Sequence, residues 1–132
     1  MNFHFSNKIK ILSTSLIAAV VLLLAVVWGI NTGQKIAQAK IVSQGSQAAI
    51  AALRYFYQDQ NRYPSPEEFA NQNLMLNYMS NFPLPNYTSS ACSQSFVYKR
   101  PDPATFQLSF CLPTATGGYQ SGWNIINGNS GK

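Results

Sequence analysis

Charged side chains are scarce in this sequence. Lys, Arg, Asp and Glu together make up 10% of its 132 residues, and only 4 residues are acidic. The net charge is +5, but the basic residues are scattered among Asn, Gln, Ser and Thr. Nucleic-acid binding depends on neutralising many phosphates, and the only paired candidates for that role are Lys99 and Arg100. We therefore expect no nucleic-acid partner.

The groups that enzymes use for proton transfer are equally scarce. The single histidine, His4, stands alone near the N-terminus, and the acidic residues Glu67 and Glu68 are explained by the start of a helix. Hydroxyl side chains are plentiful, but no base is visible that would activate one as a nucleophile. No set of residues has the composition of a metal site. The sequence predicts a protein that is not an enzyme, with no catalytic, cofactor or metal site.

Only two cysteines are present, Cys92 and Cys111. A lone pair in the C-terminal part of a membrane-anchored chain favours a disulfide formed in an oxidising compartment. Closing a loop of this length would stabilise a small domain by about 3 kcal/mol in the chain-entropy model. The alternative interpretation is two free thiols with a purely structural role.

The longest apolar run lies near the N-terminus. Residues 11–30 form a continuous apolar run of about the length that crosses a bilayer as a helix. Lys8 and Lys10 before the run favour a cytoplasmic N-terminus, whereas Lys35 and Lys40 follow it closely. The expected disulfide decides for the first orientation. We predict a cytoplasmic N-terminus at 1–10, a transmembrane helix at 11–30 and an extracytoplasmic remainder.

A cleaved signal peptide is the alternative for this segment. Ala37-Gln38-Ala39 has the small-x-small form of a cleavage site. The apolar run is longer than the apolar region of a typical signal peptide, and the site lies well beyond its end. A retained anchor is therefore the favoured interpretation.

No proline interrupts residues 31–60, which we predict to continue the same helix outside the membrane. A helical projection places one apolar stripe there, expected to pack on the sheet of the same chain. The stripe comprises Ala37, Ile41, Gly45, Ala48, Ala49, Ala52, Tyr55 and Phe56. Gly29 and Gly33 are a small-xxx-small pair that could admit another helix, or could simply weaken this one. Candidate residues for helix assembly are Gly29, Gly33, Ile41, Ala48 and Ala52.

Residues 61–132 are predicted to form a small globular domain. The helix should end near Tyr63 and Pro64, and Ser65 and Glu68 have the spacing of a capping box that starts a short second helix. Alternating apolar residues then predict strands at 95–99, 105–111 and 122–128, the last closed by an Asn-Gly turn. The junction between helix and sheet is assigned to Tyr55, Phe56, Tyr63 and Pro64. The expected class is α+β.

This order of parts resembles the type IV pilins and the pseudopilins of type II secretion systems. The residues that carry the resemblance are Ala52-Leu53, Tyr55 to Tyr57 and Asp59 to Pro64, together with the hairpin sequence FVYKRPDPATFQLSFCL. The resemblance covers nearly the whole chain. It implies a pilin-like fold and a structural subunit of a filament or pseudopilus, whose partners are the membrane and like subunits bound through the N-terminal helix.

Two features of that family are absent. Its members have a glycine followed by an aromatic residue or Met at a leader cleavage site, and a glutamate within the apolar run. Here the first glycine is Gly29 and the first glutamate is Glu67. These absences favour a rival function, that of a membrane-anchored extracytoplasmic binding module or minor assembly factor that does not polymerise.

Overall fold

The computed structural model describes residues 5–129, and the side chains of residues 16–129. The predicted cytoplasmic segment 1–10 therefore lies outside the residues with described side chains. Three helices, α1 (Phe5–Gln60), α2 (Pro66–Ala70) and α3 (Gln72–Met75), precede three strands, β1 (Phe96–Asp102), β2 (Thr105–Leu112) and β3 (Gly122–Asn129). The chain divides into two compact units, Met1–Gln34 and Lys35–Lys132. The expected α+β class, with one long N-terminal helix and a small antiparallel sheet, is confirmed.

Asn61, which was not predicted to end the helix, sets the end of α1. Asn61 has a φ of 54° and its backbone N–H donates to the Tyr57 carbonyl at 2.8 Å. This left-handed conformation is a common way to terminate a helix, and asparagine is one of the few residues other than glycine that adopt it readily. The helix therefore ends at Gln60, four residues before Pro64, which could not continue it.

The capping box that starts α2 is confirmed. The backbone N–H of Glu68 donates to the Ser65 hydroxyl at 3.2 Å, and the Glu68 carboxylate accepts from the backbone N–H of Ser65 at 2.7 Å. Pro66 stands in the first turn, where its missing N–H costs nothing. These reciprocal bonds satisfy two donors that the start of a helix leaves free.

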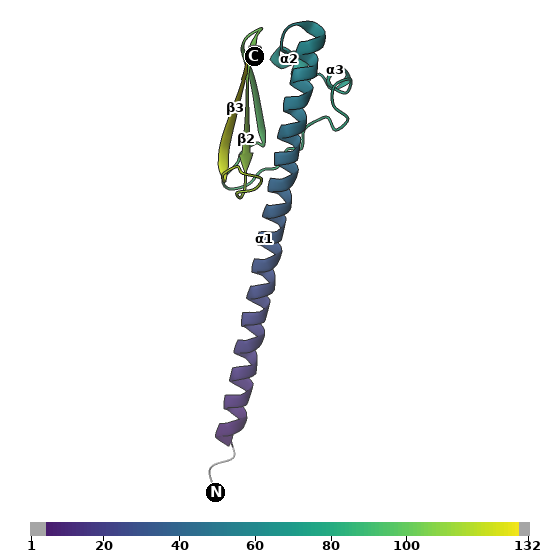
Figure 1. Ribbon diagram of the computed structural model, residues 1–132. Coiled ribbons are helices and arrows are strands. Elements are labelled where there is room, and N and C mark those ends of the chain that lie inside the picture. The colour runs from purple at the N-terminus through teal and green to yellow at the C-terminus, as the bar shows by residue number, and fades with distance from the viewer. Residues whose placement is uncertain (1–4, 130–132) are drawn as a thin grey trace. The chain divides into compact units, whose positions relative to one another are not determined.

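The sheet is antiparallel with the order β1-β2-β3, so β2 is the central strand. In β2 every second side chain, Phe106, Leu108 and Phe110, is almost fully buried, as the alternation of the sequence predicted. Within the C-terminal unit the sheet lies along α1, and α3 lies on the other side of that helix (Figure 1). The sheet therefore has one face on the core and one face toward solvent.

Two hydrophobic clusters join the sheet to α1. The first contains Ala49, Ala52 and Leu53 of the helix with Phe106 and Leu108 of β2. The second contains Ala39 and Val42 with Phe110 and Leu112. Later residues of β2 thus meet earlier residues of α1, which means that the central strand runs antiparallel to the helix.

The predicted Asn-Gly turn at the end of the last strand is wrong. Asn127 and Gly128 both lie inside β3, where Gly128 is paired with Phe106. A Cβ atom at Gly128 would overlap the Phe106 ring, so this glycine is required by packing rather than by a turn. An Asn-Gly pair that follows apolar residues can form a turn or can lie inside a strand. The sequence pattern is the same for both, so it could not distinguish them.

We expect Gly128→Ala to destabilise the domain by about 1–3 kcal/mol, the usual cost of overpacking. The Phe106 ring is 3% exposed and packs edge-on against Tyr63 with ring centroids 4.7 Å apart, so it cannot easily move aside. Thermal unfolding of the full chain in neutral detergent, followed by near-ultraviolet circular dichroism, measures the change. Asn129→Ala, at an exposed position of the same strand, is the control and should stay within about 0.5 kcal/mol of the wild type. Equal melting temperatures for the two variants would contradict the packing argument.

The predicted disulfide is confirmed: Cys92 is bonded to Cys111, with their Cα atoms 5.7 Å apart. It ties the segment before β1 to the end of β2, and both residues are buried. The closed loop spans a sequence separation of 19 residues.

Reduction of this bond should lower the free energy of unfolding by about 3 kcal/mol, because the unfolded chain regains the freedom of the loop. The melting temperature of the full chain in detergent, with and without reductant, measures this. The double variant Cys92→Ala, Cys111→Ala should melt at a low temperature that reductant does not change. A wild type that is insensitive to reductant would show that the loop needs no covalent closure.

Candidate functional site

Within the N-terminal unit, α1 is apolar and exposed on every side. The large hydrophobic residues described between Leu16 and Ile30 have exposed fractions of 48–74%. The helix is long and apolar enough to span a membrane. Apolar surface of this extent requires lipid or other apolar helices to cover it.

Gly29 and Gly33 stand at the end of this apolar stretch. No side chain or distant backbone atom lies within 4 Å of the position that a Cβ would take at either residue. The two glycines therefore have no packing role within the described part of this chain. The surface over them is open to a second helix.

In the C-terminal unit, α1 has two apolar faces. The face toward the sheet consists of small residues with a few larger ones, at helical spacing. Its buried members are Ala39, Val42, Ser43, Ser46, Ala49, Ala52, Leu53 and Phe56. Ser46 satisfies its buried hydroxyl by donating to the Ser43 carbonyl at 2.8 Å, so the small polar residues lie in the core without cost from an unpaired group.

The predicted stripe is therefore only partly the face that packs on the sheet. Ala49, Ala52 and Phe56 are buried as expected, but Ala37, Ile41, Ala48 and Tyr55 are exposed. Ser43, which is not part of the predicted stripe, is buried. The error has a physical cause: alanine and serine occur on both sides of this helix, so polarity alone could not fix which side the sheet covers.

Two of the site assignments need correction. Ala52, assigned to helix assembly, has no exposed surface because it lies in the core of its own domain. Tyr55, assigned to the helix-sheet junction, is 61% exposed and borders an open pocket with Asp59, Asn77 and Tyr78. Asp59 accepts a hydrogen bond from the Tyr78 hydroxyl at 2.7 Å.

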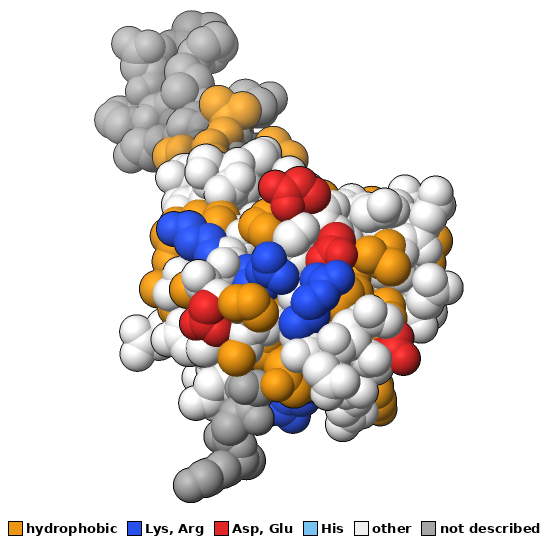
Figure 2. Space-filling model, turned by 90° about the horizontal axis from the view of Figure 1, so that it is seen from above, with side chains coloured by type: hydrophobic (Ala, Val, Ile, Leu, Met, Phe, Trp, Pro, Cys, Tyr) orange, Lys and Arg blue, Asp and Glu red, His pale blue; other side chains and the backbone are white. Residues whose placement is uncertain are grey.

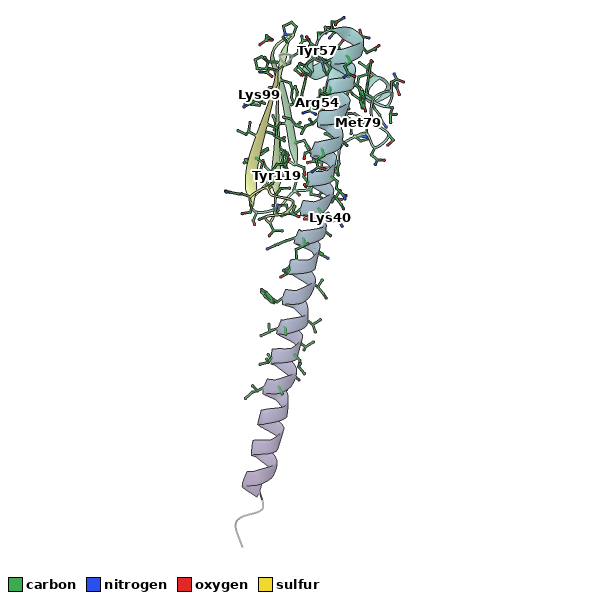
Figure 3. All side chains as sticks on the ribbon, in the orientation of Figure 1. Lys40, Arg54, Tyr57, Met79, Lys99 and Tyr119 are labelled. Carbon is green, nitrogen blue, oxygen red and sulfur yellow. A yellow bond between two sulfur atoms is a disulfide. The ribbon has the colours of Figure 1, made fainter. Side chains whose placement is uncertain are left out.

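The exposed apolar face of α1 repeats every seven residues at Ile41, Ala48 and Tyr55. Ile41 and Ala48 line a groove of about 150 Å³ between α1 and the segment that follows α3. The other lining residues are Gln44, Gly45, Met79, Asn81 and Pro85. Figure 3 labels Met79 on the side of α1 that faces away from the sheet. We call Ile41, Ala48 and Tyr55 the outer stripe.

The outer stripe has the seven-residue spacing that lets one helix pack along another. Ile41 is 41% exposed, so a substantial part of its surface is still accessible to a partner. Gly45 cannot carry a larger side chain without pressing on the Phe96 ring, which would stand 3.3 Å from its Cβ. Because Gly45 has no side chain, this part of the groove stays open.

The junction at the end of α1 is centred on Tyr63, which is 3% exposed. Its backbone N–H donates to the Pro103 carbonyl at 2.8 Å, and its carbonyl accepts from the Arg100 guanidinium at 3.0 Å. The next residue, Pro64, is buried, and its carbonyl accepts from the Tyr98 hydroxyl at 2.8 Å. Of the predicted junction residues, Tyr63 and Pro64 thus contact the β1-β2 hairpin, whereas the buried Phe56 packs against Tyr78 with ring centroids 5.0 Å apart.

An ion pair beside this junction was missed from the sequence. Arg62 donates to both carboxylate oxygens of Glu68, at 2.6 and 2.7 Å, and its guanidinium stacks over the Phe56 ring at 5.5 Å. Figure 2, which looks down on this end of the domain, shows basic and acidic side chains gathered among hydrophobic ones. The capping box already explained the presence of Glu68. Arg62 lies six residues before it, a spacing that matches no common local motif, so the sequence did not predict this pair.

Comparison of the chain with protein-family models, curated proteins and solved structures finds no match. Among the described residues, no group of three or more His, Cys, Asp or Glu side chains could hold a metal ion.

The pH dependence of stability should report the Arg62–Glu68 pair. Hydrogen bonding from Arg62, with a smaller contribution from the Ser65 backbone N–H, lowers the pKa of Glu68 from 4.5 to about 2. A carboxyl whose pKa is lower in the folded state stabilises the fold fully above its unfolded pKa, and the stabilisation is lost as the pH falls from about 4.5 to about 2.

We therefore expect Glu68→Gln to be less stable than the wild type near neutral pH, by about 1 kcal/mol, and the difference to vanish by about pH 2. The magnitude is limited by solvent, because the two side chains are 37% and 31% exposed. Thermal unfolding at a series of pH values measures it. Glu67→Gln removes a neighbouring carboxylate that forms no ion pair with any described residue, and should keep most of the wild-type pH dependence. A constant difference between wild type and Glu68→Gln at all pH values would rule out the pair as its source.

Proposed function

We propose that this chain is a structural subunit of a type IV pilus-like filament or a type II secretion pseudopilus. Residues 11–30 anchor it in the membrane with the N-terminus in the cytoplasm, and the C-terminal domain is extracytoplasmic. Its partners are like subunits, bound through α1, and its role is not catalytic. The observation that carries the proposal is the outer stripe, an apolar helix face that the domain itself leaves uncovered.

The two exposed apolar parts of α1 need different partners to cover them. Lipid can cover the apolar surface from Leu16 to Ile30. If residues 11–30 span the bilayer, the outer stripe lies beyond it, where lipid does not reach. Its seven-residue spacing suits another helix better than a flat surface. Packing of α1 helices side by side would cover both parts of the helix continuously.

The order of elements supports the same proposal. A long N-terminal helix, a short helical segment, a three-stranded antiparallel sheet and a disulfide near the C-terminus are the parts that the resemblance to pilins and pseudopilins led us to expect. In such an assembly the helices would be central and the sheets peripheral. The solvent-facing side of the sheet would then lie away from the helix contacts.

One observation favours a second candidate, a membrane-anchored module or minor assembly factor that does not polymerise. The sequence contains no acidic residue before Asp59. The apolar run therefore has no carboxylate to pair with the N-terminus of a neighbouring subunit, as the family's glutamate does. A subunit without that pair would need to be held in a filament by apolar contacts alone.

Electron microscopy of material sheared from the cell surface, labelled with antibody to the C-terminal domain, distinguishes the two candidates. Polymerisation predicts label along filaments, and a monomeric anchor predicts label confined to the membrane fraction. Ile41→Lys places a charge on the outer stripe and should abolish filaments. It should leave the circular dichroism spectrum unchanged, because the side chain is 41% exposed.

The matched control is Ile125→Lys, which places the same charge on the solvent-facing side of the sheet, where Ile125 is 59% exposed. Filaments should persist in this variant. Loss of filaments in both variants, or in neither, would show that the outer stripe is not the assembly surface. Absence of filaments from the wild type would favour the second candidate.

A further inference from the structure

A second pocket lies within the C-terminal unit, on the other side of α1 from the groove of the outer stripe. It has a volume of about 410 Å³, within the usual range for small-molecule sites. Ile50 and Arg54 of α1 form one wall, and the end of β3 forms the other. The lining is completed by Tyr63, Phe106, Ile126, Asn127, Gly128 and Asn129. The proposed assembly function makes no use of it.

Arg54 is the charged residue of this pocket. Its side chain is exposed, and it takes part in no ion pair with any residue that the structure describes. No acidic residue is among the described residues that line the pocket. Figure 3 labels Arg54 on α1 at the level of the sheet. Among the residues that the structure describes, no acidic side chain therefore compensates the positive charge of this pocket.

Tyr63 supplies a second polar group. The residue is 3% exposed, yet its hydroxyl makes no hydrogen bond to any described residue. Because the described residues include no fully buried side-chain polar atom without a partner, this hydroxyl borders open space. Arg54 and Tyr63 both line this cavity, so a guanidinium and a phenol O–H are available to one ligand. Burial raises the pKa of Tyr63, while the charge of Arg54 acts in the opposite direction.

The remaining lining is partly apolar and partly backbone. Ile50 and Ile126 contribute apolar surface beside the buried Phe106 ring, which fills the position that a side chain at Gly128 would take. β3 is an edge strand, so alternate residues along it direct both their backbone N–H and their C=O groups away from β2. The pocket therefore offers backbone hydrogen-bond donors and acceptors beside the Arg54 side chain.

We propose that this pocket binds a carboxylate carried on a short apolar stem. The Arg54 guanidinium and the Tyr63 hydroxyl donate to the carboxylate oxygens, and the stem lies on Ile50, Phe106 and Ile126. Charge-assisted hydrogen bonds from a guanidinium are among the strongest contacts that a carboxylate makes. The same chemistry is offered by the side chain of a glutamate in a partner and by the free carboxyl end of a peptide.

The test uses the ¹⁵N-labelled full chain in neutral detergent, with NMR chemical shifts of the Gly128 amide and the Arg54 side-chain N–H as the readout. N-acetylglutamic acid amide probes the side-chain carboxylate and N-acetylglycine the chain-terminal one. Their neutral counterparts are N-acetylglutamine amide and N-acetylglycinamide, and ionic strength is held constant. Saturable shifts with one or both acids, and none with the amides, support the proposal. The acid that binds more tightly identifies the source of the carboxylate.

Three variants test which side chains contact the bound acid. Arg54→Gln should weaken binding of the acid about tenfold, because it removes the charged donor. Tyr63→Phe keeps the ring contacts with Tyr57 and Phe106 and should weaken binding about threefold through loss of one hydrogen bond. Lys99→Gln removes an exposed charge outside the pocket and should change nothing.

Three results would overturn the proposal. These are the absence of saturable shifts with either acid, equal affinity in the wild type and Arg54→Gln, and equal shifts with inorganic phosphate at the same ionic strength. None of them bears on filament formation, because the outer stripe shares no residue with this pocket.

Discussion

The close approach of the sheet to the small side chains of α1 is the contact on which the rest of the C-terminal domain depends. Aromatic and aliphatic residues of β2 fill the space that alanine and serine leave on the helix, so one helix face and one strand contribute to both core clusters. The first cluster also contains Tyr63, Phe69, Met75 and Met79. Burial of large side chains against a smooth helix provides most of the free energy available to a domain of this size. The disulfide, the capping box and the Tyr63 backbone contacts then fix the chain segments that lead into and out of this layer.

Short sequence motifs gave correct predictions where the motif commonly forms a single structure. The capping box at Ser65 and Glu68, the alternation in β2 and the pairing of two lone cysteines were all predicted correctly. A motif that commonly forms two different structures gave a wrong prediction. An Asn-Gly pair can form a turn or, as at Gly128, lie under an aromatic ring. Contacts between distant residues, such as that of Tyr63 with Pro103, left no local pattern at all.

The candidate site shows the same division. Helical periodicity predicted Ile41 and Ala48 as residues for helix contacts, and both are exposed and line one groove. It could not separate them from Ala52, because the side that a sheet covers is decided by tertiary packing and not by the amphipathic pattern. The helix carries apolar residues on two sides, and its own domain covers only one. The proposed assembly and the proposed carboxylate pocket use different surfaces of the same helix, which leaves each open while the other is occupied.

The antiparallel run of β2 along α1 also has a consequence for biosynthesis. The helix face that includes Val42 and Leu53 meets its partners only in residues 106–112, more than fifty positions later in the chain. A ribosome therefore exposes the whole second half of the helix, with both apolar faces uncovered, before the strand that covers one of them has been made. Partial chains in this interval are the species most prone to aggregation, and they are natural clients for a chaperone.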